Sequence, residues 1–228
     1  NTVTAIDTLA FYISGLEKVE IPDSVKTIGN GSFGYNQYMT ECVINNSSKL
    51  ETIDDYAFDC CVSLESINIP CFVSRIGVCG FSNCKSLTDV DFKKDGMLET
   101  IDVEAFSCAN IIGVLELPNA LEIVEDKVFR GNVGITEIIL GKNAKTIETQ
   151  AFDGCSSLKN ITFSNVLERI DNLAFADCNN LTSVTLPDTV TSVGYRAFYC
   201  DGLLSASVPS ACVVDSQAFP SSCVITYR

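Results

Sequence analysis

The sequence predicts a β-rich solenoid, in which short coils of similar sequence stack into one rod. Three observations predict this fold. A pair ending in phenylalanine recurs with a regular period, apolar residues hold fixed positions around it, and turn-forming residues separate the units. Residues 1–228 all follow the scheme, so we expect a single domain of about ten coils, each 21–25 residues long.

The phenylalanine of the repeated pair anchors each coil. Ten of the 13 phenylalanines occupy this position. They are Phe11, Phe33, Phe58, Phe81, Phe106, Phe129, Phe152, Phe175, Phe198 and Phe219. Isoleucine or valine stands five residues before every anchor. Because a unit this short cannot bury its own apolar side, we expect neighbouring coils to bury phenylalanine on phenylalanine along the array.

An extended segment follows the anchor in each coil. In one coil it contains Ile67 and Ile69, which are two residues apart and so point to one face of a strand. Proline then closes the strand in five coils, because proline cannot donate to a β-ladder. The two 25-residue coils lack this proline and gain residues at 45–49 and 93–97, which we interpret as turn insertions.

The segment before the anchor should contain a short extended piece and a tight turn. Only Gly, Asp or Glu occurs four residues before the anchor, as in Gly29, Asp54 and Gly77. Glycine permits an unusual backbone angle, and aspartate can accept a nearby amide as a cap. We therefore predict a one-turn or 3-10 helix around each anchor.

The combined pattern L-x-x-I-x-L-P-x-x-V-x-x-I-G-x-x-A-F-x-x-C resembles the BspA-like leucine-rich repeats over essentially the whole chain. The resemblance implies a β-rich leucine-rich-repeat solenoid with a parallel β-sheet on its concave side. Short strands, turns and 3-10 or one-turn helices would form the rest. That family is associated with microbial cell-surface and secreted proteins, including adhesins that bind host matrix proteins. An extracellular or cell-surface location follows as an expectation, but no ligand does, because fold does not carry function with it.

The composition restricts the partners. The net charge is −14, from 29 acidic and 15 basic residues, which makes nucleic acid and anionic membranes poor partners. No apolar run approaches the ~18 residues of a membrane span, so we expect no membrane insertion. The acidity is otherwise explained by solubility. Stacked coils also allow end-to-end self-association.

Twelve cysteines are present, and several recur two or three residues after the anchor, as in Cys61, Cys84, Cys155 and Cys178. Repetition in a structural column favours buried thiols that act as small hydrophobes. A disulfide framework is the alternative, because cysteines in adjacent coils would lie within bridging range. Zinc is disfavoured by the lack of histidine and of a CxxC pair.

The sequence offers no catalytic site. Without histidine, the chain cannot supply a Ser–His–Asp or Cys–His arrangement. Carboxylate pairs such as Asp89 and Asp91 have ordinary structural explanations as caps or solvated strand residues. We therefore expect a non-catalytic protein with no cofactor and no metal site.

The candidate binding surface is the outward side of the strands, at positions seven, eight and ten after each anchor. The predicted site comprises Glu41, Val43, Asn68, Asp89, Asp91, Val114, Glu116, Glu137 and Ile139. Apolar residues set among carboxylates favour the docking of a protein with a basic surface. An ordinary polar sheet face is the alternative interpretation.

Three functions stay open. The first is a protein-binding module used for adhesion or as a scaffold. The second is carbohydrate binding, which the lack of tryptophan and of aromatic residues among these positions disfavours, although Tyr12, Tyr35 and Tyr38 offer a small platform at one edge. The third is calcium-dependent binding through Asp89 and Asp91, although calcium requires six to eight oxygen ligands.

Overall fold

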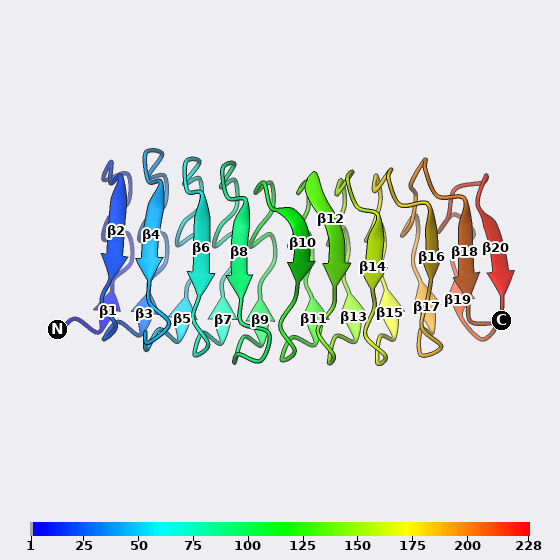
Figure 1. The fold of residues 1–228 in the computed structure, drawn as a ribbon, viewed down its shortest axis with the longest axis horizontal. Helices are drawn as coiled ribbons and strands as arrows, with labels where there is room; N and C mark the ends of the chain where they lie inside the picture. The colour runs from blue at the N-terminus through cyan, green and yellow to red at the C-terminus, as the bar shows by residue number, and fades with distance from the viewer. Residues whose placement is uncertain (1) are drawn as a thin grey trace.

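The computed structural model describes residues 2–228 and shows a stack of coils along one axis, with the chain termini at opposite ends (Figure 1). It is a β-solenoid of about 10 turns with repeats of about 23 residues, as predicted. We number the coils 1 to 10 by their anchors, from Phe11 to Phe219. Each coil contributes one short strand and one longer strand, and all strand pairs are parallel.

The short strands contain two residues each and precede the anchors. They are β1 (Ala5–Ile6), β3 (Thr27–Ile28), β5 (Thr52–Ile53), β7 (Arg75–Ile76), β9 (Thr100–Ile101), β11 (Ile123–Val124), β13 (Thr146–Ile147), β15 (Arg169–Ile170), β17 (Ser192–Val193) and β19 (Val213–Val214). They form two sheets, β1-β3-β5-β7-β9 and β11-β13-β15-β17-β19. The apolar residue five before each anchor is the inward residue of this ladder, which explains why that column is invariant.

The longer strands follow the anchors. They are β2 (Lys18–Ile21), β4 (Glu41–Ile44), β6 (Ser66–Ile69), β8 (Asp89–Phe92), β10 (Ile112–Glu116), β12 (Gly134–Ile139), β14 (Asn160–Thr162), β16 (Ser183–Thr185), β18 (Ser205–Val208) and β20 (Val224–Tyr227). Their hydrogen-bonded groups are β2-β4, β6-β8, β10-β12-β14 and β16-β18-β20. In Figure 1 these strands lie side by side across the face nearest the viewer. They form the sheet that was predicted to be concave.

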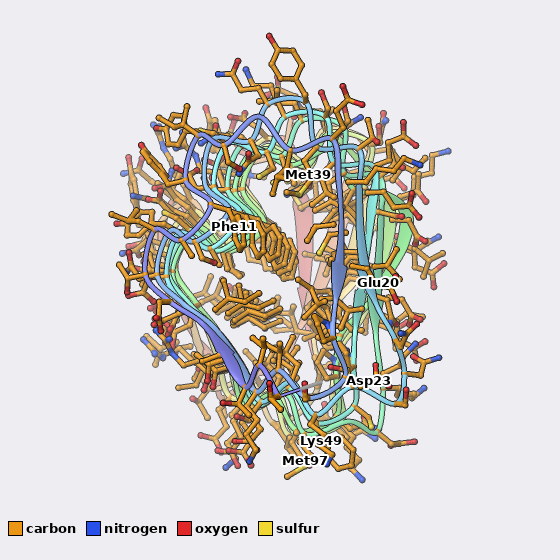
Figure 2. The ribbon with its side chains drawn as sticks, turned by 90° about the vertical axis from the view of Figure 1, so that its left-hand side faces the viewer. Phe11, Glu20, Asp23, Met39, Lys49 and Met97 are labelled. Atoms are coloured by element: carbon orange, nitrogen blue, oxygen red, sulfur yellow. The ribbon has the colours of Figure 1, made fainter. Side chains whose placement is uncertain are left out.

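The core is a continuous column of stacked phenylalanine rings. Neighbouring anchors have ring centroids 5.0–5.6 Å apart and nearly parallel planes. Figure 2 looks along this column from the end that carries Phe11. The rings of coils 2 to 9 are fully buried. The stacking prediction is therefore confirmed.

The predicted helix around each anchor is wrong, because the described residues 2–228 form turns there instead. In coil 3, Ala57 N donates to Asp54 O at 3.3 Å and Asp59 N donates to Tyr56 O at 3.1 Å. The amides between them, such as that of Phe58, donate to the next coil instead. Residues two before and two after most anchors have positive φ, as in Tyr56 (56°) and Cys60 (57°). A left-handed residue interrupts a right-handed helix, and the ladder to the next coil offsets its strain.

The role predicted for the glycines four before the anchor also needs correction. Gly29, Gly77 and Gly194 do not adopt positive φ. A Cβ on Gly29 would lie 2.7 Å from Ile6 O, and one on Gly77 would lie 2.5 Å from Asp55 N. Glycine is required here because the backbone of the preceding coil approaches closely.

The predicted strand ends are confirmed. Pro22 and Pro70 directly follow β2 and β6, and the insertions 45–49 and 93–97 directly follow β4 and β8 as turns. Between these two insertions lies a hollow of about 420 Å³ that exposes Phe72 and Met97. Tolerance of extra residues is thus confined to this edge of the solenoid.

Side chains three residues after the anchor donate hydrogen bonds to backbone carbonyls of the preceding coil. Cys61 Sγ donates to Phe33 O at 3.2 Å, and Cys84 Sγ donates to Phe58 O at 3.2 Å. Where the column carries asparagine, the amide does the same, since Asn132 Nδ2 donates to Phe106 O at 2.9 Å. Burial raises the pKa of the Cys61 thiol to about 12. All twelve cysteines are free thiols in the structure.

Candidate binding surface

The outward side chains of the longer strands form one continuous surface, which we call the long-strand face. The parallel register places equivalent residues of successive coils directly beside one another. Lys18 neighbours Glu41, Asn68 neighbours Asp91, and Glu137 neighbours Asn160. Each strand buries alternate residues in the core and leaves the others for this surface.

The nine residues of the predicted site all lie on the long-strand face. Glu41, Asp89, Asp91 and Val114 are exposed, whereas Val43, Asn68, Glu116, Glu137 and Ile139 are half-buried. They extend from β4 to β12 and so do not form one compact cluster. Binding by these residues stays a prediction.

Three of the five carboxylates in the predicted site form ion pairs within the chain. Lys18 contacts Glu41 at 2.9 Å, Lys93 contacts Asp91, and Lys94 contacts Glu116. Exposed ion pairs contribute little to stability, but each lysine offsets the charge of its partner. Among the described residues, no basic side chain lies within 4 Å of Asp89 or Glu137, so these two carboxylates keep their charge available.

Asn68 is occupied by contacts within the protein. Its Nδ2 donates to Ile44 O at 2.8 Å and to Asn46 Oδ1 at 3.2 Å. Asn46 belongs to the 45–49 insertion, so Asn68 fixes this turn against the edge of the face. The contact is not apparent from the sequence, because it depends on where the insertion folds.

The clearest apolar cluster lies on β10 and β12, the two longest strands. A register shift between Gly113 and Val114 makes β10 bulge, and Gly113 has a φ of 78°. Val114 then neighbours Glu137, and Ile139 neighbours Glu116. Val114 is 57% exposed and Ile112 is 55% exposed. Because bulges redirect side chains out of a regular ladder, this position presents more apolar surface than any other part of the predicted site.

A hollow of about 370 Å³ adjoins this cluster at the C-terminal ends of the strands. Two predicted residues, Glu116 and Ile139, line it. Its other walls include Phe163, Asn119, Lys94 and Lys142, which the sequence analysis did not single out. The coil pattern placed Asn119, Lys94 and Lys142 in turns and Phe163 at the last apolar position of its strand segment. Nothing in the sequence indicates that a gap opens between them.

The aromatic platform differs from the prediction in its members. Tyr12 and Tyr35 contact edge to face with ring centroids 5.6 Å apart. Tyr38 stands apart at 69% exposure, and Tyr56 completes the hollow beside the other two rings. This hollow lies among the turns around the anchors and not on the long-strand face.

Metal binding and membrane insertion each require a distinct structural feature. Within residues 2–228, no three acidic or cysteine side chains lie close enough together to hold a metal ion. No helix among these residues has the length and apolarity needed to cross a membrane. Predicted end-to-end association would use coil surfaces such as that of Phe11, which is 41% exposed, and stays a prediction.

Two parallel ladders around a phenylalanine-filled core, with apolar columns at fixed spacing, define a leucine-rich-repeat solenoid. The sequence matches the BspA type leucine rich repeat region in six copies, over residues 4–133 and 99–226. The chain therefore belongs to this family of leucine-rich repeats.

Solved structures with the same fold come from several bacteria. A leucine rich cell surface protein from Faecalibacterium prausnitzii is 24% identical with a TM-score of 0.58, and the alignment covers 97% of this chain and 62% of that one. A leucine-rich repeat protein from Eubacterium ventriosum is 20% identical with a TM-score of 0.64, covering 98% and 69%. The leucine rich repeat protein of T. pallidum is 25% identical with a TM-score of 0.53, covering 78% and 72%. Comparison with the curated proteins gave no match.

Proposed function

We propose that this protein is a non-catalytic binding module of a microbial cell surface or secretome, and that it binds a protein with a basic surface through the long-strand face. The observation that carries this proposal is the cluster on β10 and β12, where exposed Val114 and half-buried Ile139 lie among carboxylates. Membership of the BspA-type family and likeness to a protein described as a cell surface protein support the location.

We expect the residues of the proposed site to contribute in different ways. Among residues 2–228, no lysine or arginine forms an ion pair with Asp89 or Glu137, so these two would attract a basic partner from a distance and speed association. Val114 and Ile139 contribute after docking, when their apolar surface is removed from water. Glu41, Asp91 and Glu116 are already paired with lysines and contribute less.

A panel of microbial and host surface proteins, screened by surface plasmon resonance, would identify the partner. With a partner in hand, neutralising Glu41, Asp89, Asp91, Glu116 and Glu137 together should slow association and flatten its salt dependence. The variant V114S/I139S should instead speed dissociation, because it removes contacts that form only in the bound complex.

The matched control neutralises five acidic residues away from the face: Asp23, Asp126, Asp153, Asp177 and Asp188. Both sets change the net charge equally. Equal loss of binding in the two sets would reduce the effect to bulk charge and remove the long-strand face as the site. The same panel should include glycans and added calcium, since binding that depends on either supports the corresponding alternative function.

A further inference from the structure

Arg196 differs from every other arginine in the described residues. Arg75, Arg130, Arg169 and Arg228 each contact a carboxylate, whereas Arg196 contacts none. Its guanidinium carbon lies 5.2 Å from the ring centre of Tyr195 and 4.6 Å from that of Tyr199. Its Nε is buried and has no hydrogen-bond partner among these residues. In a chain of net charge −14, an arginine without a carboxylate is notable because acceptors are abundant.

The two tyrosines fix the orientation of the Arg196 side chain. Contacts with aromatic rings hold the planar guanidinium in place and leave its terminal Nη–H groups, unlike the buried Nε–H, as donors to an outside acceptor. Tyr195 and Tyr199 are 38% and 41% exposed, so the group lies at the surface. It is thus arranged to meet a carboxylate from outside the chain, with aromatic surface beside it.

A complementary hollow lies on the same side of the solenoid. Arg196 and Tyr199 stand two before and one after their anchor, and side chains in these two columns form what we call the turn face. In coil 2 both columns hold glycine, Gly31 and Gly34, so one row of side chains is missing there. The missing row leaves a hollow of about 420 Å³ between Tyr12 of coil 1 and Tyr56 of coil 3.

The hollow has the chemistry that a guanidinium requires. Its walls are mainly the rings of Tyr12, Tyr35 and Tyr56, and it also contains the Asp59 carboxylate. No basic side chain among residues 2–228 lies within 4 Å of Asp59, and burial raises the pKa of this carboxyl above its usual range. An incoming cation would therefore meet aromatic faces and an uncompensated carboxylate.

We propose that two copies of this protein associate side by side and antiparallel through their turn faces, with Arg196 of each copy entering the Tyr12–Tyr35–Tyr56–Asp59 hollow of the other. A two-fold axis makes this contact self-complementary, so it occurs twice in each dimer. Coil n of one copy faces coil 11 − n of the other, which pairs coil 2 with coil 9. The two contacts lie roughly 35 Å apart, at about 5 Å per coil.

The centre of the turn face is compatible with this arrangement. Near the axis, coil 5 faces coil 6, which brings Glu104 of one copy toward Lys127 and Arg130 of the other. In cis these groups already form the pairs Lys127–Glu104 and Arg130–Asp153, so they can share partners across the axis. In coils 4 and 8 the column one after the anchor holds the small residues Ser82 and Ala176, which allow close approach.

Sedimentation equilibrium tests the proposal. The wild-type chain should show a monomer–dimer equilibrium below about 100 µM that weakens as salt rises. Both Arg196→Glu and Asp59→Arg should weaken dimerisation at least about tenfold, because each places like charges in both contacts. The double variant R196E/D59R should recover most of the affinity, because the two charges are exchanged across each contact.

Controls separate this contact from net charge and from misfolding. Lys49→Glu and Asp95→Arg make the same charge changes at exposed turns away from the turn face and should leave dimerisation unchanged. Arg196→Lys keeps the charge but loses the planar, stacked geometry, so it should give an intermediate affinity. Circular dichroism confirms that each variant folds.

Cross-linking tests the antiparallel register independently. Cys108 is an exposed thiol of coil 5 that stands two residues after its anchor, directly beside the turn face, so the two copies of Cys108 would lie close to the axis. A short bis-maleimide should join them, and Cys108→Ser should abolish this dimer, whereas Cys71→Ser should not. A wild-type chain that stays monomeric at all these concentrations overturns the proposal. So does a dimer that R196E and D59R leave intact.

Discussion

The long-strand face has two halves that differ in chemistry. From β2 to β12 its outward positions include eight acidic residues: Glu17, Glu20, Glu41, Glu65, Asp89, Asp91, Glu116 and Glu137. From β14 to β20 the corresponding positions carry no acid and consist mainly of Asn, Ser and Thr, as in Asn160, Thr162 and Ser183. The inward positions show no such difference, because both halves bury the same aliphatic and phenylalanine columns.

The comparison shows that the repeat constrains only the residues that face inward. Rings 5.0 Å apart between Phe58 and Phe81, and 5.2 Å apart between Phe152 and Phe175, demonstrate that the core is equivalent in both halves. Outward residues are then free to diverge without cost to the fold. A binding function that depends on negative charge should therefore reside in the acidic half, from β2 to β12. Both halves should contribute equally to the stability of the fold.

The largest expected effect tests whether the core contributes equally to stability in the two halves of the solenoid. Phe152→Ala and Phe58→Ala should each cost about 3–5 kcal/mol, because each removes one ring from the middle of a packed column. Since coils couple mainly to their neighbours, hydrogen exchange should accelerate only in the coils around the substitution. Chemical denaturation followed by hydrogen–deuterium exchange measures both quantities.

Phe219→Ala is the matched control, because this ring has a stacked neighbour on one side only. It should cost less than either internal substitution. A uniform, small acceleration of exchange over the whole chain would contradict the column model, and a large difference between Phe58 and Phe152 would contradict the equivalence of the two halves.

The next effect tests whether all carboxylates of the acidic half contribute equally to association with a basic partner. The pair D89N/E137Q removes carboxylates that form no ion pair within the described residues, whereas D91N/E116Q removes carboxylates already paired with Lys93 and Lys94. Both pairs change the net charge by two. We expect the first to slow association with a basic partner several-fold and the second to have little effect, as measured by surface plasmon resonance at low salt. Equal slowing by the two pairs would show that the lysines do not screen their partners.

Much of the fold was predictable because the regular spacing of the anchors shows which residues of successive coils are equivalent. Ile67 and Ile69 identified a strand face, Pro70 identified its end, and the anchors identified the core column. The turns were not predictable, because Tyr56 and Arg196 adopt positive φ without being glycine, asparagine or aspartate. The amide of Tyr56 donates to Val78 O of the next coil, and such bonds between coils have no signature within one coil.

The candidate site was predictable in position but not in its electrostatics. Counting from the anchor placed Asp91 and Glu116 on the outward side of their strands. Their pairing with Lys93 and Lys94 depends on how the 93–97 insertion folds. The gap lined by Lys142 and Phe163 arises where a turn before β13 meets the residue that follows β14. Sequence periodicity thus gives the direction of a side chain, whereas its neighbours depend on the irregular segments.

A smaller effect concerns two acids of the C-terminal half, Glu148 and Asp171, which directly follow the short strands β13 and β15. Burial and a hydrogen bond with Asp171 raise the pKa of Glu148 from its ordinary value of 4.5 to about 7, against the opposing effect of Arg169. Between these two pH values the unfolded chain releases the proton that the folded chain keeps. Stability from this group therefore falls as the pH rises from 4.5 to 7.

The variant Glu148→Gln should remove this part of the pH dependence. Above pH 7 it should raise the melting temperature by roughly 2 °C, a modest change because the group is partly screened by solvent. Thermal unfolding between pH 5 and pH 8 measures the effect. Glu168→Gln, an exposed neighbour, serves as the control and should leave the pH profile unchanged. A profile that stays the same in the Glu148 variant would show that Glu148 is not the source of this pH dependence.

The smallest expected effect is a difference in cysteine reactivity between the N-terminal and C-terminal halves of the wild-type protein. Cys61 and Cys84 in one half and Cys155 and Cys178 in the other donate to phenylalanine carbonyls and are fully buried. Burial raises the pKa of Cys155 to about 12, so its reactive thiolate is scarce at neutral pH. The two exposed thiols, Cys71 and Cys108, both belong to the N-terminal half. A maleimide under native conditions should therefore label these two first, and peptide mapping should find the early label only before residue 109.

After unfolding in denaturant, most of the twelve cysteines should titrate as free thiols. If mass spectrometry instead found four or more disulfides, the column would be a covalent framework and not a set of hydrogen-bonded thiols. That result would also indicate an oxidising compartment.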